Sequence, residues 1–147
     1  MYQYTGCGLD NILLADGYRE HETPYGRSVA VEDVQGLHRA IAESIVDSKP
    51  TLSGKEFRFL RLELEMSQKR IGEIIGAGAQ AIAIWEKKDK VTKSGDHFIR
   101  YLYKRYTGGD PDIVALIDRL NSLDKDNFHK NVEFKYDQEN TIWKKVA

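Results

Sequence analysis

The sequence predicts an α+β fold that is mainly α, in which a small strand-and-helix module precedes a five-helix domain and a short C-terminal β-hairpin. Within residues 54–120, apolar residues recur every three or four positions, as on the buried faces of amphipathic helices. Short alternating segments bounded by turn residues lie on both sides of that region, as expected of strands. The polar residues 47–51 include a proline and serve as the predicted linker. We therefore divide the chain into residues 1–50, 51–122 and 123–147.

The first module is expected to combine strands with one helix. Two short segments flank Asp16-Gly17, a pair that favours a tight hairpin turn. In chain order, the predicted strands and turns are strand 11–14, turn Asp16-Gly17, strand 18–22, turn 24–26 and strand 28–31. A helix should follow from about Asp33. Its predicted apolar face consists of Val34, Leu37, Ile41 and Ile45.

The central domain should open with a helix that begins at Gly54. Ser53 and Glu56 have the spacing of a capping box, in which the two side chains satisfy backbone N–H groups at a helix start. The apolar face of this helix comprises Phe57, Leu60 and Leu64.

A second helix is expected to begin at Gln68, because the hydroxyl of Ser67 can accept a hydrogen bond from an unpaired N–H of the first turn. Its apolar face comprises Ile71, Ile74 and Ile75. The segment Gly76-Ala77-Gly78 should end it, since glycine adopts positive φ at little cost and is unfavourable inside a helix.

A third helix is expected from about Ala79 to Lys87. One face of this helix should contact the two preceding helices, and it comprises Ala81, Ile82 and Trp85. The opposite face should point outward, and it comprises Ala79, Gln80, Ala83 and Ile84. Two short helices joined by a glycine turn are the layout of a helix-turn-helix.

Two more helices complete the predicted domain. Ser94 is the expected cap of a fourth helix, which should stop at Gly108-Gly109. Asp110 followed by Pro111 indicates the start of a fifth helix, because proline is favoured at the first helical position. The apolar positions of the two helices are Phe98, Ile99, Leu102 and Tyr106 in the fourth, and Ile113, Leu116, Ile117 and Leu120 in the fifth.

The last part of the sequence predicts a β-hairpin. Residues 132–136 alternate between apolar and polar types like a half-buried strand, residues 137–140 form a turn, and residues 141–146 alternate again. An isolated hairpin is marginally stable in water, so this one should pack on something. Addition to the N-terminal strands and pairing with a partner subunit are both open possibilities.

The central domain resembles the Cro-type phage-repressor (XRE) helix-turn-helix family. In that family a Ser-Gln pair opens the second helix, as Ser67-Gln68 does here. The recognition helix ends in a trio of Trp or Tyr, Glu, and Lys or Arg, and an Ile or Val lies three residues before that trio. Ile82 and Trp85-Glu86-Lys87 match this pattern. The resemblance covers residues 53–106 and is nearest to the two-domain antitoxins of the motility quorum-sensing toxin system. It implies a repressor-like five-helix fold.

The resemblance also implies roles for individual residues in binding double-stranded DNA. Gln80 occupies the position of the base-reading Asn of those antitoxins, and its amide can pair with adenine in the major groove. Ala79 and Ala83 would touch thymine methyl groups, and Ile84 stands where such proteins place a polar base or phosphate reader. The residues expected to contact phosphates are Gln68, Lys69, Lys87, Lys88 and Lys90.

The charge distribution favours the same function, although the net charge of the chain is −1. Residues 52–107 carry 12 basic and 7 acidic side chains, a net charge of +5, whereas residues 1–51 carry −4 and residues 108–147 carry −2. Positive charge is therefore concentrated in the segment predicted to bind DNA.

A metal site and catalysis are both disfavoured. The related antitoxins carry an N-terminal zinc module built on paired Cys-x-x-Cys motifs, but Cys7 is the single cysteine of this chain, so no zinc, metal ion or other cofactor is expected. The sequence contains no P-loop, Gly-x-Ser-x-Gly, His-Glu-x-x-His or dinucleotide-binding motif. His21, His38, His97 and His129 are interpreted as surface histidines, and the protein is not expected to be an enzyme.

These observations predict a sequence-specific transcriptional regulator, either a repressor or an autoregulating antitoxin, that binds a palindromic operator as a homodimer. A toxin or another protein would bind the N-terminal module. The alternative is a protein-interaction module that uses the helix-turn-helix as a scaffold, which the apolar Ala79, Ala83 and Ile84 favour. We expect a cytoplasmic protein, since the sequence shows neither a secretory signal nor an apolar segment long enough for a membrane span.

Overall fold

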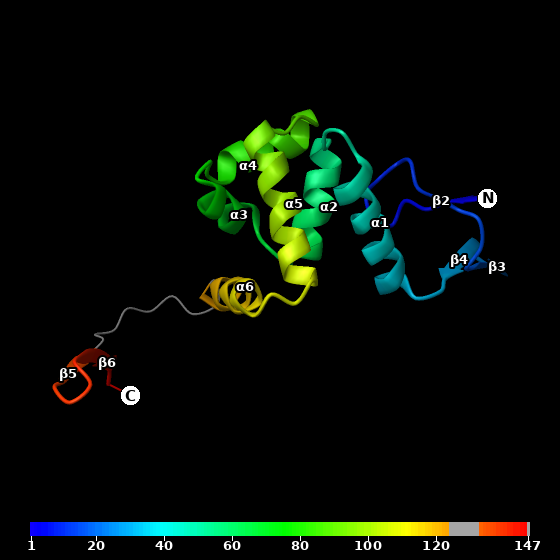
Figure 1. Ribbon diagram of the computed structural model, residues 1–147. Helices are drawn as coiled ribbons and strands as arrows, with labels where there is room; N and C mark the ends of the chain where they lie inside the picture. The colour runs from blue at the N-terminus through cyan, green and yellow to red at the C-terminus, as the bar shows by residue number, and fades with distance from the viewer. Residues whose placement is uncertain (124–132, 147) are drawn as a thin grey trace.

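The computed structural model describes residues 1–123 and 133–146, and in that part of the chain the architecture is α+β, with six helices and three two-stranded antiparallel sheets (Figure 1). The helices are α1 (Val34–Ser48), α2 (Gly54–Glu63), α3 (Gln68–Ile75), α4 (Ala79–Lys88), α5 (Lys93–Thr107) and α6 (Pro111–Leu123). The strands are β1 (Tyr2–Gln3), β2 (Leu13–Leu14), β3 (Tyr18–Thr23), β4 (Gly26–Val31), β5 (Phe134–Asp137) and β6 (Ile142–Lys145). The predicted α+β, mainly helical fold class is confirmed.

Helices α2 to α5 pack around one apolar core. Phe57 and Leu60 of α2, Ile71 of α3, Ile82 of α4 and Ile99 of α5 are each completely buried. Residues spaced three or four apart place these side chains on the inner faces of their helices, as the periodicity predicted. The same continuous core takes in Leu14 of β2, Ile45 of α1 and Ile117 of α6.

The starts of α2 and α3 follow the predicted caps. The Ser53 hydroxyl accepts a hydrogen bond from the backbone N–H of Glu56 at 3.1 Å, and the Glu56 carboxylate accepts one from the N–H of Ser53 at 2.9 Å. At α3, the Ser67 hydroxyl accepts a hydrogen bond from the N–H of Arg70 at 2.9 Å. Both predicted start positions are confirmed, because these side chains pair N–H groups that the first turn leaves free.

The cap of α5 differs from the prediction. Thr92, and not Ser94, accepts the hydrogen bond from the N–H of Gly95, at 3.2 Å, so the helix begins at Lys93 and Ser94 lies within its first turn. Two hydroxyl residues two positions apart offer the same capping chemistry, and the choice between them depends on where the chain leaves α4. The predicted end at Gly108 and the start of α6 at Pro111 are confirmed, with Asp110 accepting from the N–H of Asp112.

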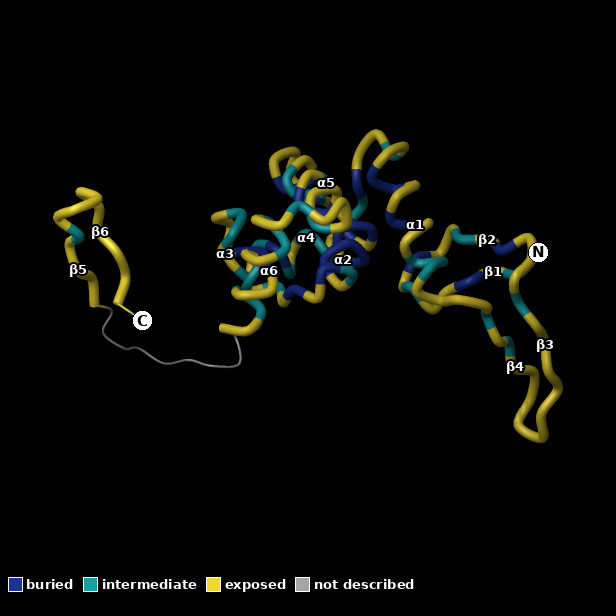
Figure 2. The backbone as a smooth tube through the Cα atoms, turned by 60° about the horizontal axis from the view of Figure 1, so that its bottom comes forward, coloured by how far each residue is buried: buried dark blue, intermediate teal, exposed yellow. Residues whose placement is uncertain are grey.

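The strand pairing in the N-terminal region was predicted wrongly. β2 pairs with β1, in the register Tyr2↔Leu14, and not with β3. Gly17 has a positive φ of 76°, but the turn there leads from one sheet into the next. β3 instead pairs with β4, and Thr23 is opposite Gly26 across a tight turn. Leu14 is buried whereas most of β3 and β4 is exposed, so the two strands beside Asp16-Gly17 belong to different environments (Figure 2).

Helix α1 packs against α2 and is tied to α5. It begins after Asp33 as predicted, but its buried face is Ile41, Ala42, Ile45 and Val46, and Val34 is 41 % exposed. Arg100 of α5 donates hydrogen bonds to the carbonyl oxygens of Val46 and Lys49. The N–H of Leu52 donates to the carboxylate of Asp96 at 2.7 Å. The segment expected to act as a linker is therefore anchored on α5.

The C-terminal hairpin forms a sheet of its own. β5 and β6 pair in the register Phe134↔Lys145 and Tyr136↔Trp143, and they do not join the N-terminal strands. The predicted start at Val132 lies outside the described residues. The expected half-buried strand is wrong for this chain taken alone, because Phe134, Tyr136 and Trp143 are all exposed (Figure 2).

Candidate functional site

The tight connection between α3 and α4 is built on two glycines. Gly76 ends α3 with a φ of 84°, in the left-handed region that glycine adopts without steric cost. The carbonyl oxygen of Gly72 accepts hydrogen bonds from the N–H groups of Gly76, Ala77 and Gly78, at 2.9, 2.9 and 3.1 Å. A Cβ on Gly72 would lie 2.5 Å from the carbonyl carbon of Gly78. The close approach of the two helices thus requires that Gly72 has no side chain.

Helix α4 presents one face to the core and one to the outside. Ile82 is fully buried, and Trp85 packs edge-on against Phe57, with ring centroids 5.6 Å apart and planes at 89°. Gln80 and Ile84 are exposed, as are Lys87 and Lys88. Residues 80, 84 and 87 are spaced four and three apart, so they form a stripe along the outside of α4.

The residues predicted to contact bases therefore divide into two groups. Gln80 and Ile84 lie on the exposed stripe, and Ile84 is 52 % exposed. Ala79 and Ala83 are half-buried at the edges of that stripe.

A buried ion pair holds the C-terminal half of α4 to the end of α2. Arg61 donates to both carboxylate oxygens of Glu86, at 2.9 Å each, and its third contact is to the carbonyl oxygen of Met66 at 2.9 Å. The exposed fraction is 8 % for the Arg61 side chain and 5 % for that of Glu86. A bidentate pair of this kind fixes geometry as well as supplying energy. The pairing of Arg61 with Glu86 was not predicted from the sequence, because the two residues are 25 positions apart.

Gln68, predicted to contact a phosphate, is part of that network. Its side-chain amide donates to the Glu86 carboxylate at 3.3 Å, and the residue is half-buried at the first turn of α3. One N–H and the carbonyl oxygen of the amide remain for other partners. Gln68 thus connects the start of α3 to the last turns of α4.

The other predicted phosphate contacts are exposed lysines. Lys69 lies on α3, Lys87 and Lys88 on the last turn of α4, and Lys90 just beyond it. Among the described residues none of these four ammonium groups takes part in an ion pair, whereas Lys49, Lys55 and Lys104 elsewhere in the chain each pair with a carboxylate. Within the described residues, these four ammonium groups are therefore left without an ion-pair partner.

No family model matches this chain, and neither does any curated protein or solved structure. We call the exposed stripe of α4 and the lysines beside it the α4 face. It comprises Gln80, Ile84, Lys87 and Lys88, with Lys69 and Lys90.

His38 was predicted to be a surface histidine, and the structure corrects this. Its Nε2 lies 2.8 Å from the hydroxyl of Tyr4, its Nδ1 lies 3.0 Å from a carboxylate oxygen of Glu63, and its ring meets Phe59 edge-on. Burial raises the pKa of the Tyr4 hydroxyl, with Cys7 as the next largest cause. The cluster joins the N-terminal segment and α1 to the end of α2.

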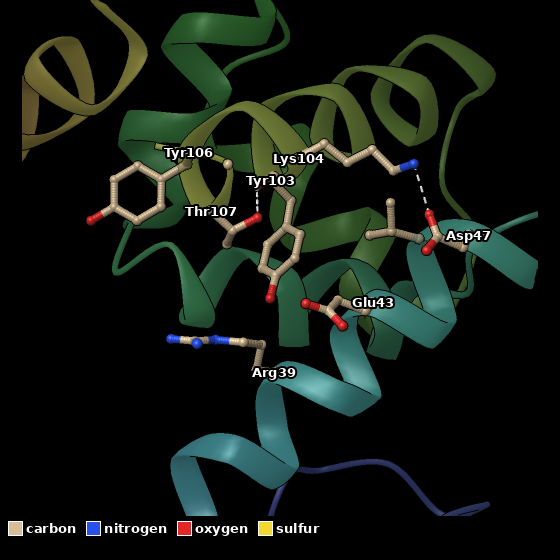
Figure 3. A pocket seen from close by; sticks show the side chains of 9 residues that line it. Arg39, Glu43, Asp47, Tyr103, Lys104, Tyr106 and Thr107 are labelled. Atoms are coloured by element: carbon tan, nitrogen blue, oxygen red, sulfur yellow. Dashed lines mark hydrogen bonds and ion pairs between the residues drawn. The ribbon is translucent and has the colours of Figure 1, made fainter. Parts of the chain in front are cut away.

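A cavity of about 670 Å³ lies between α1 and the end of α5 (Figure 3). Arg39, Glu43 and Asp47 line it from α1, and Tyr103 and Lys104 from α5, with Lys104 paired to Asp47 at 2.7 Å. Burial raises the pKa of the Tyr103 hydroxyl, and the carboxylates of Glu63 and Glu43 add to this shift. Helix α4 contributes no residue to this cavity, so it is separate from the α4 face.

The described residues contain neither a cluster of metal-binding side chains nor a membrane-spanning helix. Within residues 1–123 and 133–146, no group of three or more His, Cys, Asp or Glu side chains is arranged to hold a metal ion. Over the same residues, each helix is too short or too polar to cross a membrane.

Proposed function

We propose that this protein is a sequence-specific DNA-binding transcriptional regulator in which α3, the glycine turn and α4 form a helix-turn-helix and α4 enters the major groove. The observation that carries the proposal is the α4 face, where an amide and an aliphatic side chain lie on the outside of a helix flanked by lysines that form no ion pair with any described residue. A helix of this kind fits the major groove, and unpaired ammonium groups around it lie where phosphates would be. Helices α2 to α6 would form the repressor-like five-helix domain.

In this proposal, base contacts and phosphate contacts come from different parts of the α4 face. Gln80 reads adenine through its amide, and Ala79, Ala83 and Ile84 contact thymine methyl groups. The lysines at positions 69, 87, 88 and 90 bind phosphates, together with the free N–H of the Gln68 amide. The Arg61–Glu86 pair and the Gly72 contact hold α3 and α4 rigidly, so that these groups are positioned before DNA arrives.

The biological role we propose is repression by occlusion of a palindromic operator, with two copies on half-sites about one helical turn apart. An autoregulating antitoxin fits this role, and the N-terminal module would then carry the toxin-binding surface. A regulator of this type acts in the cytoplasm, where bacterial-type operators are found.

The exposure of Ile84 favours a second function, in which α4 is a contact surface for another protein. A large aliphatic side chain that is 52 % exposed between two half-buried alanines is also what a protein interface requires. In that case the lysines would only solvate the surface, and binding to DNA would be weak and independent of sequence.

Fluorescence anisotropy distinguishes the two functions. The duplexes are DNA from upstream of the protein's own gene and a shuffled control of the same composition, at about 50 and 200 mM salt. A preference for the native duplex that persists at the higher salt supports the regulator. Equal binding to both duplexes that disappears with salt would refute it and point to a protein partner.

A further inference from the structure

The C-terminal hairpin has one aromatic face and one polar face. Residues opposite each other across an antiparallel pair share a face, and so do alternate residues along a strand. Phe134, Tyr136, Trp143 and Lys145 therefore lie on one side. Lys135 and the ion pair of Asp137 with Lys144, at 3.1 Å, lie on the other, together with Ile142, which is 47 % exposed. The rings of Tyr136 and Trp143 are in contact, with centroids 5.3 Å apart.

This aromatic face is uncovered within the chain. The exposed fraction is 60 % for Phe134, 47 % for Tyr136 and 69 % for Trp143. Three large aromatic side chains on a hairpin of two four-residue strands form an apolar surface of the kind that proteins usually cover. A two-stranded hairpin also gains stability by packing its apolar face, because alone it is marginal in water.

Helix α6 has an uncovered apolar face as well. Leu116 is 39 % exposed and Leu123 is 45 % exposed, and because they are seven residues apart they lie on the same side of the helix. Ile117, about a quarter turn away, is fully buried and holds α6 to the core. Asp112 is exposed and lies four residues before Leu116, so a carboxylate marks one end of this leucine face.

We propose that the aromatic face of the hairpin docks on the leucine face of α6 in a second copy of this chain, reciprocally, so that two copies exchange their C-terminal hairpins. Among the described residues of one chain both faces are left open, and a second copy can cover the two of them at once. Lys145 lies beside the aromatic residues and can pair with Asp112 at the N-terminal end of the leucine face, on which the exposed Arg119 lies between Leu116 and Leu123.

The size of the contact favours reciprocal exchange over a single contact. An aromatic side chain buries about 150–250 Å² when it is fully covered, so one partly exposed hairpin face and one leucine face supply on the order of 500 Å². That is too little for a stable association, whereas two such contacts approach the roughly 1,000 Å² that a specific interface needs. The inference rests on the proposed function only in its need for a dimer, and the experiments that test it contain no DNA.

The first experiment measures self-association of the full chain by sedimentation over a range of concentrations. We expect a species of twice the 16.8 kDa chain mass, and a dimer dissociation constant at least roughly 30-fold higher for Phe134→Ala/Trp143→Ala. Lys135→Ala, on the polar face of the same hairpin, is the matched control and should self-associate like the wild type. An unchanged dimer in the double variant would overturn the proposal.

The second experiment separates exchange between chains from docking within one chain. In a Cys7→Ser background, chains carrying Lys145→Cys are mixed with chains carrying Asp112→Cys and oxidised. We expect a disulfide that joins the two different chains, and none when Lys135→Cys replaces Lys145→Cys. The absence of the mixed cross-link, or closure of a single chain bearing both cysteines at monomer mass, would overturn the exchange.

Discussion

The body formed by α2 to α5 and the C-terminal hairpin of β5 and β6 differ in where their side chains find partners. In the body, Phe57, Ile71 and Ile82 are completely enclosed by the chain, and the charged groups of Arg61 and Glu86 satisfy each other. In the hairpin, Phe134 and Trp143 are more than half exposed. The body therefore buries its apolar side chains within one chain, whereas the aromatic face of the hairpin stays exposed.

The α4 face and the C-terminal hairpin also differ in the kind of partner that each suits. A surface suits binding when its polar groups are exposed and the helices that carry them are held in place. Binding then does not have to include the entropy cost of ordering those helices. The α4 face is of this kind, because Gln80 and the lysines around it are exposed on helices that the buried pair and the glycine contact hold in place. The hairpin, by contrast, presents apolar side chains, which are suited to association between proteins.

The largest expected effect is a loss of folding stability when the buried ion pair of the body is broken. Glu86→Leu should destabilise the protein by about 3–5 kcal/mol, because it leaves the Arg61 guanidinium buried without its carboxylate. Urea unfolding followed by circular dichroism measures the change. The double variant Arg61→Met/Glu86→Leu should recover most of the loss. A single-variant loss below about 1 kcal/mol would mean that the pair is not enclosed as described.

The next effect concerns the close approach of α3 to the start of α4. Gly72→Val should cost about 3 kcal/mol in the same unfolding assay, since even a Cβ would lie 2.5 Å from a backbone carbon of Gly78. Lys69→Val, at an exposed position of α3 that forms no ion pair with the described residues, is the matched control and should change stability by about 0.5 kcal/mol or less. Equal losses for the two variants would show that the connection has room for a side chain.

A smaller effect is expected at a single lysine of the α4 face. Lys88→Ala should leave unfolding unchanged and reduce the dependence of log affinity on log salt by about one unit, because one phosphate contact is lost. Arg39→Ala, on α1 at the cavity away from α4, should leave the salt slope unchanged. Identical slopes for Lys88→Ala and the wild type would remove Lys88 from the phosphate contacts.

The smallest effect is expected in the hairpin turn. Asp137 accepts hydrogen bonds from the N–H groups of Glu139 and Asn140, and the side-chain hydrogen bond from Asn140, followed by that from Lys144, lowers the pKa of its carboxyl group. A lowered pKa means that this stabilisation is present above the ordinary aspartate pKa of about 4 and is lost as the pH falls through the lowered value. Asp137→Ala should remove the pH dependence of the Trp143 indole resonance in that acidic range. A resonance that still titrates in the variant would assign the effect to another group.

The sequence predicted the local features of the body well, because its helix ends are set by nearby residues. Ser53, Ser67 and Gly76 act within four residues of the groups they pair, so their spacing alone placed the ends of α2 and α3. Thr92 and Ser94 offered the same chemistry two residues apart, and the sequence could not separate them.

Most of the features that the sequence missed depend on residues far apart in the chain. His38 finds Tyr4 and Glu63 at separations of 34 and 25 residues, and Arg61 finds Glu86 at 25. The partner of β2 was mistaken for the same reason, since pairing depends on which strand face is buried and not on the turn alone. The close contact at Gly72 could have been predicted from the sequence. A glycine inside a predicted helix either lowers the stability of the helix or allows another segment to pack closely against it.

The most direct test of the central claim, that α4 reads bases from a rigid support, is selection from randomised duplexes by the wild type and by Gln80→Ala. We expect the wild type to enrich a palindrome with half-sites about one helical turn apart, and the variant to lose the preference for adenine at one position in each half-site, a cost of about 1–3 kcal/mol there. Enrichment of no sequence by the wild type, or the same sequence with the same preference from both proteins, would contradict the claim.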